Sequence, residues 1–236
     1  MKIDNAFLLL IFLFSTNNFY SQNGNAYYKK QLSSQENHVS SEYIKQALKK
    51  LENQEYLLSF DKNLSLYKKI ESLSVDDNPI VDAITQSIAE FSGEVYFDKR
   101  NQKIVHKKEF AGAVYLISKN IINWNLTKDT LKIDNYTCYK ATTTRTIKNP
   151  EGEHLISITA WYSPKIPLPF GPDGYGGLPG LIVQLENNGT ITTLKKIEFL
   201  EDDSIKIIEP NNGKKLTEKE FEHIVNETYN NRKNRY

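Results

Sequence analysis

Few side chains in this sequence have the type and spacing that catalysis or metal binding requires. The histidines share no metal-ligand spacing; they are His38, His106, His154 and His223. Each is expected to be a packed or solvated side chain rather than a general base. The acidic pairs Asp76-Asp77 and Asp202-Asp203 fit a helix entry and a solvated turn, and they form a catalytic pair only if folding brings other groups to them.

The known catalytic motifs are missing as well. There is no Gly-x-Ser-x-Gly elbow, no His-Glu-x-x-His and no phosphate-binding loop. Gly174-x-Gly176 lacks a third glycine and precedes a predicted strand instead of opening a helix. We therefore predict no catalytic residue, no metal and no cofactor. A hydrolase whose acid and base lie far apart in the sequence remains an alternative, because one sequence does not show which residues meet.

Cys138 is the single cysteine, so an intramolecular disulfide is impossible. One interpretation makes its thiol a nucleophile or a redox sensor. The other makes it a small buried hydrophobe on a strand, which is favoured because no histidine is near it in the sequence.

The N-terminus has the pattern of a signal peptide. Residues 6–14 are an unbroken apolar run, too short to cross a bilayer and followed by polar residues 15–18. Cleavage is expected after Ser21, which gives a signal peptide over residues 1–21 and one β-rich domain over residues 22–236. The mature chain is predicted to have no transmembrane segment and to be periplasmic or secreted.

The overall charge excludes one class of partner. The net charge is +1 and the basic residues are spread along the chain, so there is no electrostatic footprint for nucleic acid. Nothing in the composition indicates the oligomeric state.

Three segments have helical spacing and a start signal. Thr217-x-x-Glu220 is a capping box before an apolar stripe of Phe221, Ile224, Val225 and Tyr229. Asn78-Pro79 begins a second helix, expected to bury Ile80, Ile84, Ile88 and Phe91. Ser40 or Ser41 begins a third, with Ile44, Leu48 and Leu51 facing inward.

Most of the remaining chain alternates with the period of two that is typical of strands. Tyr56, Leu58 and Phe60 share one face, and short turns separate similar runs further along. Asn188-Gly189 is the strongest hairpin signal, because both residues tolerate positive φ angles. The predicted fold class is mainly β (α+β): a curved antiparallel β-sheet or half-barrel meander with about three helices packed against it.

Residues 164–180 interrupt this pattern with five prolines and five glycines, so they must form a shaped loop. The loop ends in Gly177-Leu178-Pro179-Gly180-Leu181-Ile182. Here the chain resembles the GLPGLI family, exported proteins of Bacteroidetes named after this hexapeptide. Residues 160–167 and 136–142 are also similar to the family's pattern, although Asn135 replaces an expected glycine. The family has no established biochemical activity, so the resemblance implies location and fold rather than function.

Two interpretations of the motif loop follow from its residues. In the structural one, glycine and proline shape a corner, Leu178 fills the core, and Leu181 and Ile182 enter a buried strand. In the binding one, the loop closes over a ligand. The residues concerned are Trp161, Tyr162, Pro164, Tyr175, Gly176, Gly177, Leu178, Pro179, Gly180, Leu181 and Ile182.

These observations favour a binding module of the cell envelope without catalysis. A concave aromatic face is expected to accept an apolar ligand, such as a lipid, or an extended peptide. A scaffold that docks on an outer-membrane protein is a further alternative. Asp129-Thr130-Leu131 and Asp203-Ser204-Ile205 resemble the O-glycosylation sequons of Bacteroidetes, which predicts modification of Thr130 and Ser204.

Overall fold

The computed structural model describes residues 23–33, 41–71, 78–149, 152–200 and 205–233. The predicted signal peptide, His38, Ser204 and both acidic pairs lie outside the described residues.

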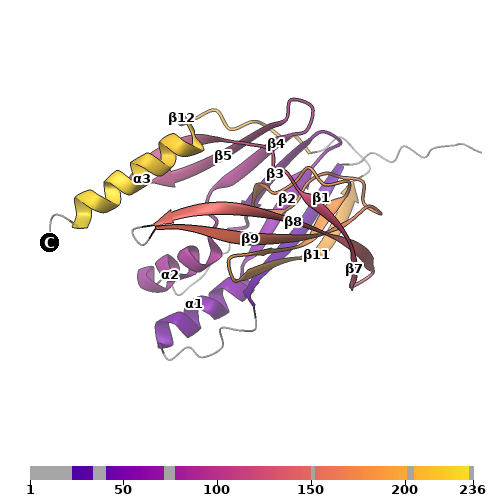
Figure 1. Ribbon diagram of the computed structural model, residues 1–236, viewed down its shortest axis with the longest axis horizontal. Helices are drawn as coiled ribbons and strands as arrows, with labels where there is room; N and C mark the ends of the chain where they lie inside the picture. Colours follow the sequence, from indigo (N-terminus) through magenta and orange to yellow (C-terminus); the bar gives the residue numbers. More distant parts are fainter. Residues whose placement is uncertain (1–22, 34–40, 72–77, 150–151, 201–204, 234–236) are drawn as a thin grey trace, which may run out of the picture.

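The described chain forms one curved twelve-stranded sheet that does not close (Figure 1). The first six strands are β1 (Asn23–Leu32), β2 (Glu55–Phe60), β3 (Leu64–Lys69), β4 (Glu94–Asp98), β5 (Lys103–Phe110) and β6 (Ala113–Lys119). The others are β7 (Asn125–Ile133), β8 (Tyr136–Asn149), β9 (Gly152–Ser163), β10 (Leu181–Asn187), β11 (Thr190–Leu200) and β12 (Lys214–Thr217). The helices are α1 (Glu42–Asn53), α2 (Pro79–Ala89) and α3 (Glu218–Lys233), with a short 3₁₀ turn η2 (Pro172–Gly174). The predicted fold class is confirmed.

Two antiparallel meanders make up this sheet. Strands β1 to β6 follow one another in space, as do β7 to β11, and pairing of β1 with β11 joins the two runs. The sheet is antiparallel except at one edge, where β12 pairs with β6 in parallel. That pairing is possible because β12 comes from a distant part of the chain instead of a hairpin with β6.

The hairpin between β10 and β11 forms as predicted. Asn188 and Gly189 have φ angles of 46° and 80°, and Asn187 pairs with Thr190 beside them. A positive φ at both turn positions matches the right-handed twist of the flanking strands.

The inner face of the curved sheet is aromatic, as expected, but it is not open. Tyr56, Leu58 and Phe60 are buried on β2, and Tyr28 and Tyr67 join them from the neighbouring strands. The same cluster contains side chains of the proline- and glycine-rich loop, namely Ile166, Leu168 and Phe170. The prediction of an open concave face for an apolar ligand is therefore wrong, because the chain fills that face with its own loop.

The helices begin where their caps predict. The Asn78 side chain accepts a hydrogen bond from the Ile80 amide at 3.0 Å, and Thr217 and Glu220 exchange the hydrogen bonds of a capping box. Helix α1 starts after Ser41 and buries Ala47 and Leu51, but the Ser41 side chain makes no cap hydrogen bond.

The predicted buried face of α2 is wrong at Ile80, whereas Ile84 and Ile88 are half-buried and Phe91, just after the helix, is buried as predicted. The helix buries Val81, Thr85 and Ala89, while Ile80 is 55% exposed. The Thr85 hydroxyl donates to the Val81 carbonyl of its own helix at 2.7 Å and lies 3.3 Å from the Ala47 carbonyl oxygen of α1, so small side chains permit the close approach of the two helices.

Helix α3 covers the β6 edge only in part. Phe221 makes edge-to-face ring contacts with Tyr115 and Phe110, whose centroids lie 5.4 Å and 5.7 Å away. Tyr229, at the other end of the predicted stripe, is 55% exposed. Among the described residues, no helix combines the length and apolar character needed to cross a bilayer.

Candidate functional site

The hexapeptide forms a rigid corner, and each of its glycines meets a specific requirement. Gly177 has a φ of 85°, a left-handed conformation that side chains disfavour. Gly180 has no room for a side chain, because a Cβ there would lie 2.3 Å from the Ser163 carbonyl oxygen. Pro179, between them, is exposed and sets the backbone direction. Backbone conformation and packing therefore require glycine at both positions of the motif.

Leu178 points into the protein and is only 2% exposed. It belongs to a second core cluster with Tyr162, Ile182 and other residues of β8 to β10, and Trp124 and Tyr175 pack against its outer side. The Trp124 indole donates to the Gly176 carbonyl at 2.8 Å, which ties the corner to the segment before β7.

The residues after the corner enter a strand that is buried on both faces. Leu181, Ile182 and Val183 are each at most 1% exposed. The Leu181 amide donates to the Ile166 carbonyl at 2.9 Å, and the Ile182 amide donates to the Phe170 carbonyl at 3.0 Å. The loop thus folds back on its own exit strand, as the structural interpretation of the motif requires.

The predicted aromatic residues of the loop are more covered than a recognition surface would be. Tyr162 is buried, and Trp161 and Tyr175 are half-buried. Trp161 donates to the Glu186 carboxylate at 3.2 Å, and the Lys140 ammonium lies 5.8 Å from its ring centre. Pro164 and Pro179 are exposed, but no aromatic side chain of the motif stands free beside them.

A buried ion pair joins this loop to the sheet. The Lys30 ammonium on β1 lies 2.6 Å from Oδ2 of Asp173 in η2, and it also donates to the Ala89 carbonyl at the end of α2, at 3.0 Å. The side chains of Lys30 and Asp173 are 1% and 11% exposed. Asp173 has a φ of 57°, in the left-handed region that residues other than glycine adopt rarely and aspartate more readily than most.

Aromatic rings surround the ammonium group. The Lys30 nitrogen lies 5.2 Å from the ring centre of Tyr56 and 5.5 Å from that of Phe91. Rings at this distance attract a cation through their negative faces. Burial, and then the nearby Asp173 carboxylate, raise the pKa of the Tyr67 hydroxyl well above its ordinary value.

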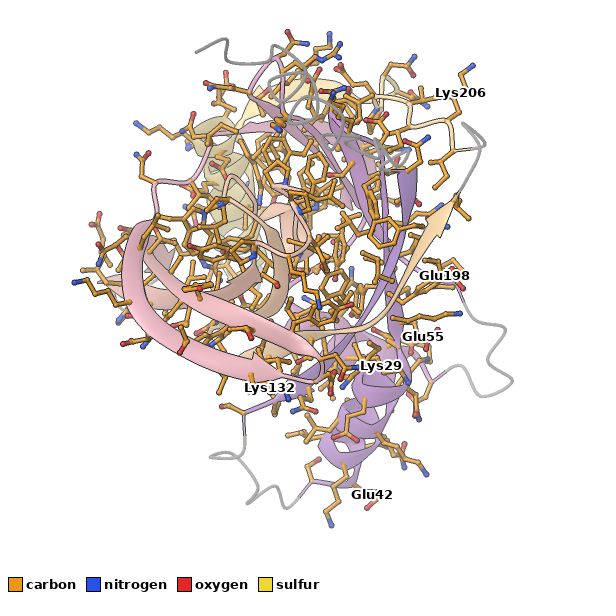
Figure 2. The ribbon with its side chains drawn as sticks, turned by 90° about the vertical axis from the view of Figure 1, so that its right-hand side faces the viewer. Lys29, Glu42, Glu55, Lys132, Glu198 and Lys206 are labelled. Carbon is orange, nitrogen blue, oxygen red and sulfur yellow. The ribbon has the colours of Figure 1, made fainter. Side chains whose placement is uncertain are left out.

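Sequence reasoning missed Lys30 and Asp173. The signal was present in β1, where Ala26, Tyr28 and Lys30 alternate onto the inner face. The preceding residue, Lys29, points outward to Glu55 at 3.7 Å, and Figure 2 shows both at the surface.

The described histidines do not form a catalytic pair with a carboxylate in a pocket. His106 is 8% exposed, its Nε2 lies 2.7 Å from the Ser92 carbonyl oxygen, and its ring stacks on Phe91. Burial lowers the pKa of His106 to about 3. His154 is exposed on β9, and the exposed His223 lies 3.4 Å from Glu227 one helical turn away.

Cys138 is fully buried in the first core cluster, and burial raises the pKa of its thiol to about 11. A thiol that stays protonated is a poor nucleophile. Its position fits the interpretation as a small buried hydrophobe. Within the described ranges, no group of three or more His, Cys, Asp or Glu side chains is placed to hold a metal ion.

A broad open depression of about 1720 Å³ lies between the α1–α2 pair and strands β2 to β6. Charged side chains of both signs line it: Lys49, Lys50, Lys68, Lys69, Lys107, Glu71, Asp82, Glu94 and Glu109. Several of them pair with each other, including Lys107 with Glu94 at 3.0 Å. Because charged side chains are spread among the apolar ones, this open depression lacks the continuous apolar surface that an apolar ligand would need.

The hairpin of β7 and β8 forms the free edge of the sheet. Within the part of the chain that the structure describes, β7 pairs only with β8, and the register shift between Leu126 and Thr130 indicates a bulge. Three large apolar side chains are exposed on this hairpin: Leu126, Leu131 and Tyr139. Thr130, the predicted glycosylation residue, is exposed on the same strand.

Comparison with known proteins gives a family match over part of the chain. A family model described as "Protein of unknown function (Porph_ging)" matches residues 148–184, which include β9, the motif loop and the start of β10. No curated protein matches this sequence.

Two solved structures are similar in fold. A structure of PNGF-II in space group P21 has a TM-score of 0.52 and 14% sequence identity, and the match covers 87% of this chain and 33% of that one. A structure of PNGF-II in space group C2 has a TM-score of 0.52 and 13% identity, with 86% and 32% covered. This chain therefore spans about a third of the length of those structures, and at this identity the similarity concerns the fold alone.

Proposed function

We propose that this chain is an exported cell-envelope protein of the GLPGLI family that binds an extended peptide segment of a partner protein along β7. The complete hexapeptide and the family match around it support the family assignment. The apolar run of residues 6–14 supports export. N-terminal sequencing of the protein from its native host tests export separately, and the expected first residue is Gln22.

The interior of the curved sheet is filled, so a small apolar ligand is not the expected partner. The motif loop occupies the aromatic face, and the broad depression elsewhere is lined by charges. A peptide that adds to a sheet edge needs no cavity, since backbone hydrogen bonds supply much of its affinity.

The free edge of β7 is the observation that carries the proposal. Ile133 pairs with Tyr136 across the two-residue turn Asp134-Asn135, so these two residues exchange backbone hydrogen bonds. In an antiparallel ladder the hydrogen-bonded residues alternate, which turns the amides of Thr130 and Lys132 outward. These outward groups are available to a new strand.

Side chains on the hairpin indicate the character of the peptide. Lys128 and Lys132 have no ion-pair partner among the described residues, whereas Lys140 lies 3.5 Å from Asp129. Leu131 is 41% exposed beside them. An extended peptide with alternating acidic and apolar residues therefore complements this edge in charge and in apolar contact.

The bulge between Leu126 and Thr130 explains how such an edge avoids pairing with other copies of itself. Bulges and lysines are the usual means by which exposed edges resist self-association. In this protein, the bulge limits regular strand pairing next to the turn to residues 130–133 of β7. The partner peptide is therefore expected to make a short ladder and to depend on its acidic side chains.

Fluorescence anisotropy with two labelled synthetic peptides tests the proposal. An alternating Glu-Val peptide is expected to bind, and an alternating Lys-Val peptide is not. Thr130→Pro removes an outward amide without breaking the ladder to β8, so we expect affinity to fall about tenfold, or about 1.4 kcal/mol, with little change in melting temperature. Lys132→Glu is expected to weaken binding to a similar extent, because a negative charge there repels the acidic side chains of the peptide. Equal binding of both peptides, or unchanged binding by Thr130→Pro, refutes the edge assignment.

A further inference from the structure

The Lys30–Asp173 pair has an unusual combination of properties. The two side chains come from positions 143 residues apart, lie 2.6 Å from each other, and are almost completely buried among aromatic rings. Burying two opposite charges costs several kcal/mol for each ion, and a good geometry repays this only when every remaining hydrogen-bonding atom is satisfied.

The hydrogen bonds of this pair are incomplete. Among the described residues, the ammonium group has two oxygen acceptors for its three hydrogens, Oδ2 of Asp173 and the Ala89 carbonyl. Oδ1 of Asp173 is buried and has no hydrogen-bond partner in the same set of residues, and neither has the Tyr67 hydroxyl. The Asp173 carboxylate is close enough to Tyr67 to help raise the pKa of its hydroxyl, after burial, so these two oxygens belong to neighbouring groups.

We infer that Lys30 and Asp173 are the two halves of an intramolecular isopeptide bond, formed after folding, that joins β1 covalently to the motif loop. The side chains supply all the atoms of the reaction. A primary amine and a carboxyl group are held in contact, and the surrounding rings of Tyr56 and Phe91 exclude water.

The step balances without a further reactant. A proton passes from the Lys30 ammonium to the Asp173 carboxylate, which gives a neutral amine and a carboxylic acid. The nitrogen lone pair attacks Cγ of Asp173 and forms the C–N bond. The tetrahedral intermediate then loses its hydroxyl group and one nitrogen-bound proton as water, so a C–O bond breaks and nothing is oxidised or reduced. The Tyr67 hydroxyl stands beside the carboxyl oxygen on which negative charge develops.

The product satisfies the groups that the ion pair leaves unpaired. The new amide has one N–H, which matches the Ala89 carbonyl that already accepts from the Lys30 nitrogen at 3.0 Å. Its carbonyl oxygen matches the unpaired Tyr67 hydroxyl. Two buried charges disappear, and the number of donors equals the number of acceptors. In the amide product every one of these donors has an acceptor, whereas in the buried salt bridge some of them have none.

A covalent link at this position also suits the rest of the chain. Cys138 is the only cysteine, so no disulfide can secure the fold. The bond would fix the loop that fills the sheet interior to a central strand, and it would resist reducing agents.

Mass spectrometry of the full chain under denaturing conditions tests the inference. We expect a mass lower than the sequence mass by one water, with the N-terminus read from the same sample. Trypsin should fail to cleave after Lys30, and fragmentation should show residues 30–45 joined to residues 166–195.

Two substitutions of adjacent lysines provide the matched comparison. Lys30→Met should restore the full mass and abolish the branched peptide. Lys29→Met removes a lysine of the same strand that faces solvent, and it should keep the loss of water. A full sequence mass for the protein without substitutions, together with tryptic cleavage after Lys30 and an unlinked peptide of residues 166–195, overturns the inference whether or not either variant folds.

Discussion

Replacing Leu178 with alanine is the most direct test of the structural interpretation of the hexapeptide. Leu178 is 2% exposed and packs in the second core cluster beside Tyr162 and Ile182. Truncating a buried leucine removes its transfer free energy and leaves a cavity, which costs about 2–5 kcal/mol. We expect about 3 kcal/mol here, because Trp124 and Tyr175 on the outer side are only partly buried and can close part of the space.

For a chain of this size, 3 kcal/mol corresponds to a decrease in melting temperature of roughly 6–12 °C. Urea denaturation followed by circular dichroism gives the free energy directly. Leu155→Ala is the matched control, because Leu155 is 74% exposed on β9 and its truncation should cost less than about 0.5 kcal/mol. If the two variants lose the same stability, Leu178 does not anchor the corner and the structural interpretation of the motif fails.

Other predictions concern the same core. Gly180→Ala should destabilise the protein more than Gly177→Ala in thermal melts, because the first creates a backbone clash with Ser163 and the second only an unfavourable φ of 85°. Stability should fall as the pH drops from about 6.5 towards 3. Burial lowers the pKa of His106 in the folded protein to about 3, so over this range the unfolded chain binds a proton that the folded chain does not. In urea titrations, His106→Gln should lose less stability over the same pH range. Cys138 should not react with a thiol reagent in the native protein and should react fully in urea, since it is buried with a pKa of about 11.

The features that were predictable from sequence have causes within a few neighbouring residues. The caps at Asn78 and Thr217 depend on hydrogen bonds that span two or three positions, and both form. The turn at Asn188-Gly189 depends on the φ preferences of its own two residues. The buried position of Leu178 follows from its place between glycine and proline at the entrance of an apolar strand.

The errors arise where distant segments decide the outcome. The face of α2 is set by its contact with α1, where Thr85 meets Ala47, so the larger Ile80 is left outside. The parallel pairing of β12 depends on where the chain returns after β11.

The Lys30–Asp173 contact is of the same kind, because no local pattern connects positions 143 residues apart. The position of Lys30 on the inner face of β1 indicated that its charge needs a buried partner. Its partner was identifiable only from the folded structure.

The late position of the motif loop constrains the order in which the chain can fold. Strands β1 to β4 leave the ribosome first, yet the side chains that cover their inner face lie at Ile166, Leu168 and Phe170. β1 must also wait for β11, more than 150 positions later, to gain its second neighbour. Until then the nascent chain exposes a row of tyrosines and an unpaired edge, and contacts so distant in sequence form slowly. The inner face of the sheet can therefore be covered only after the motif loop has been synthesised.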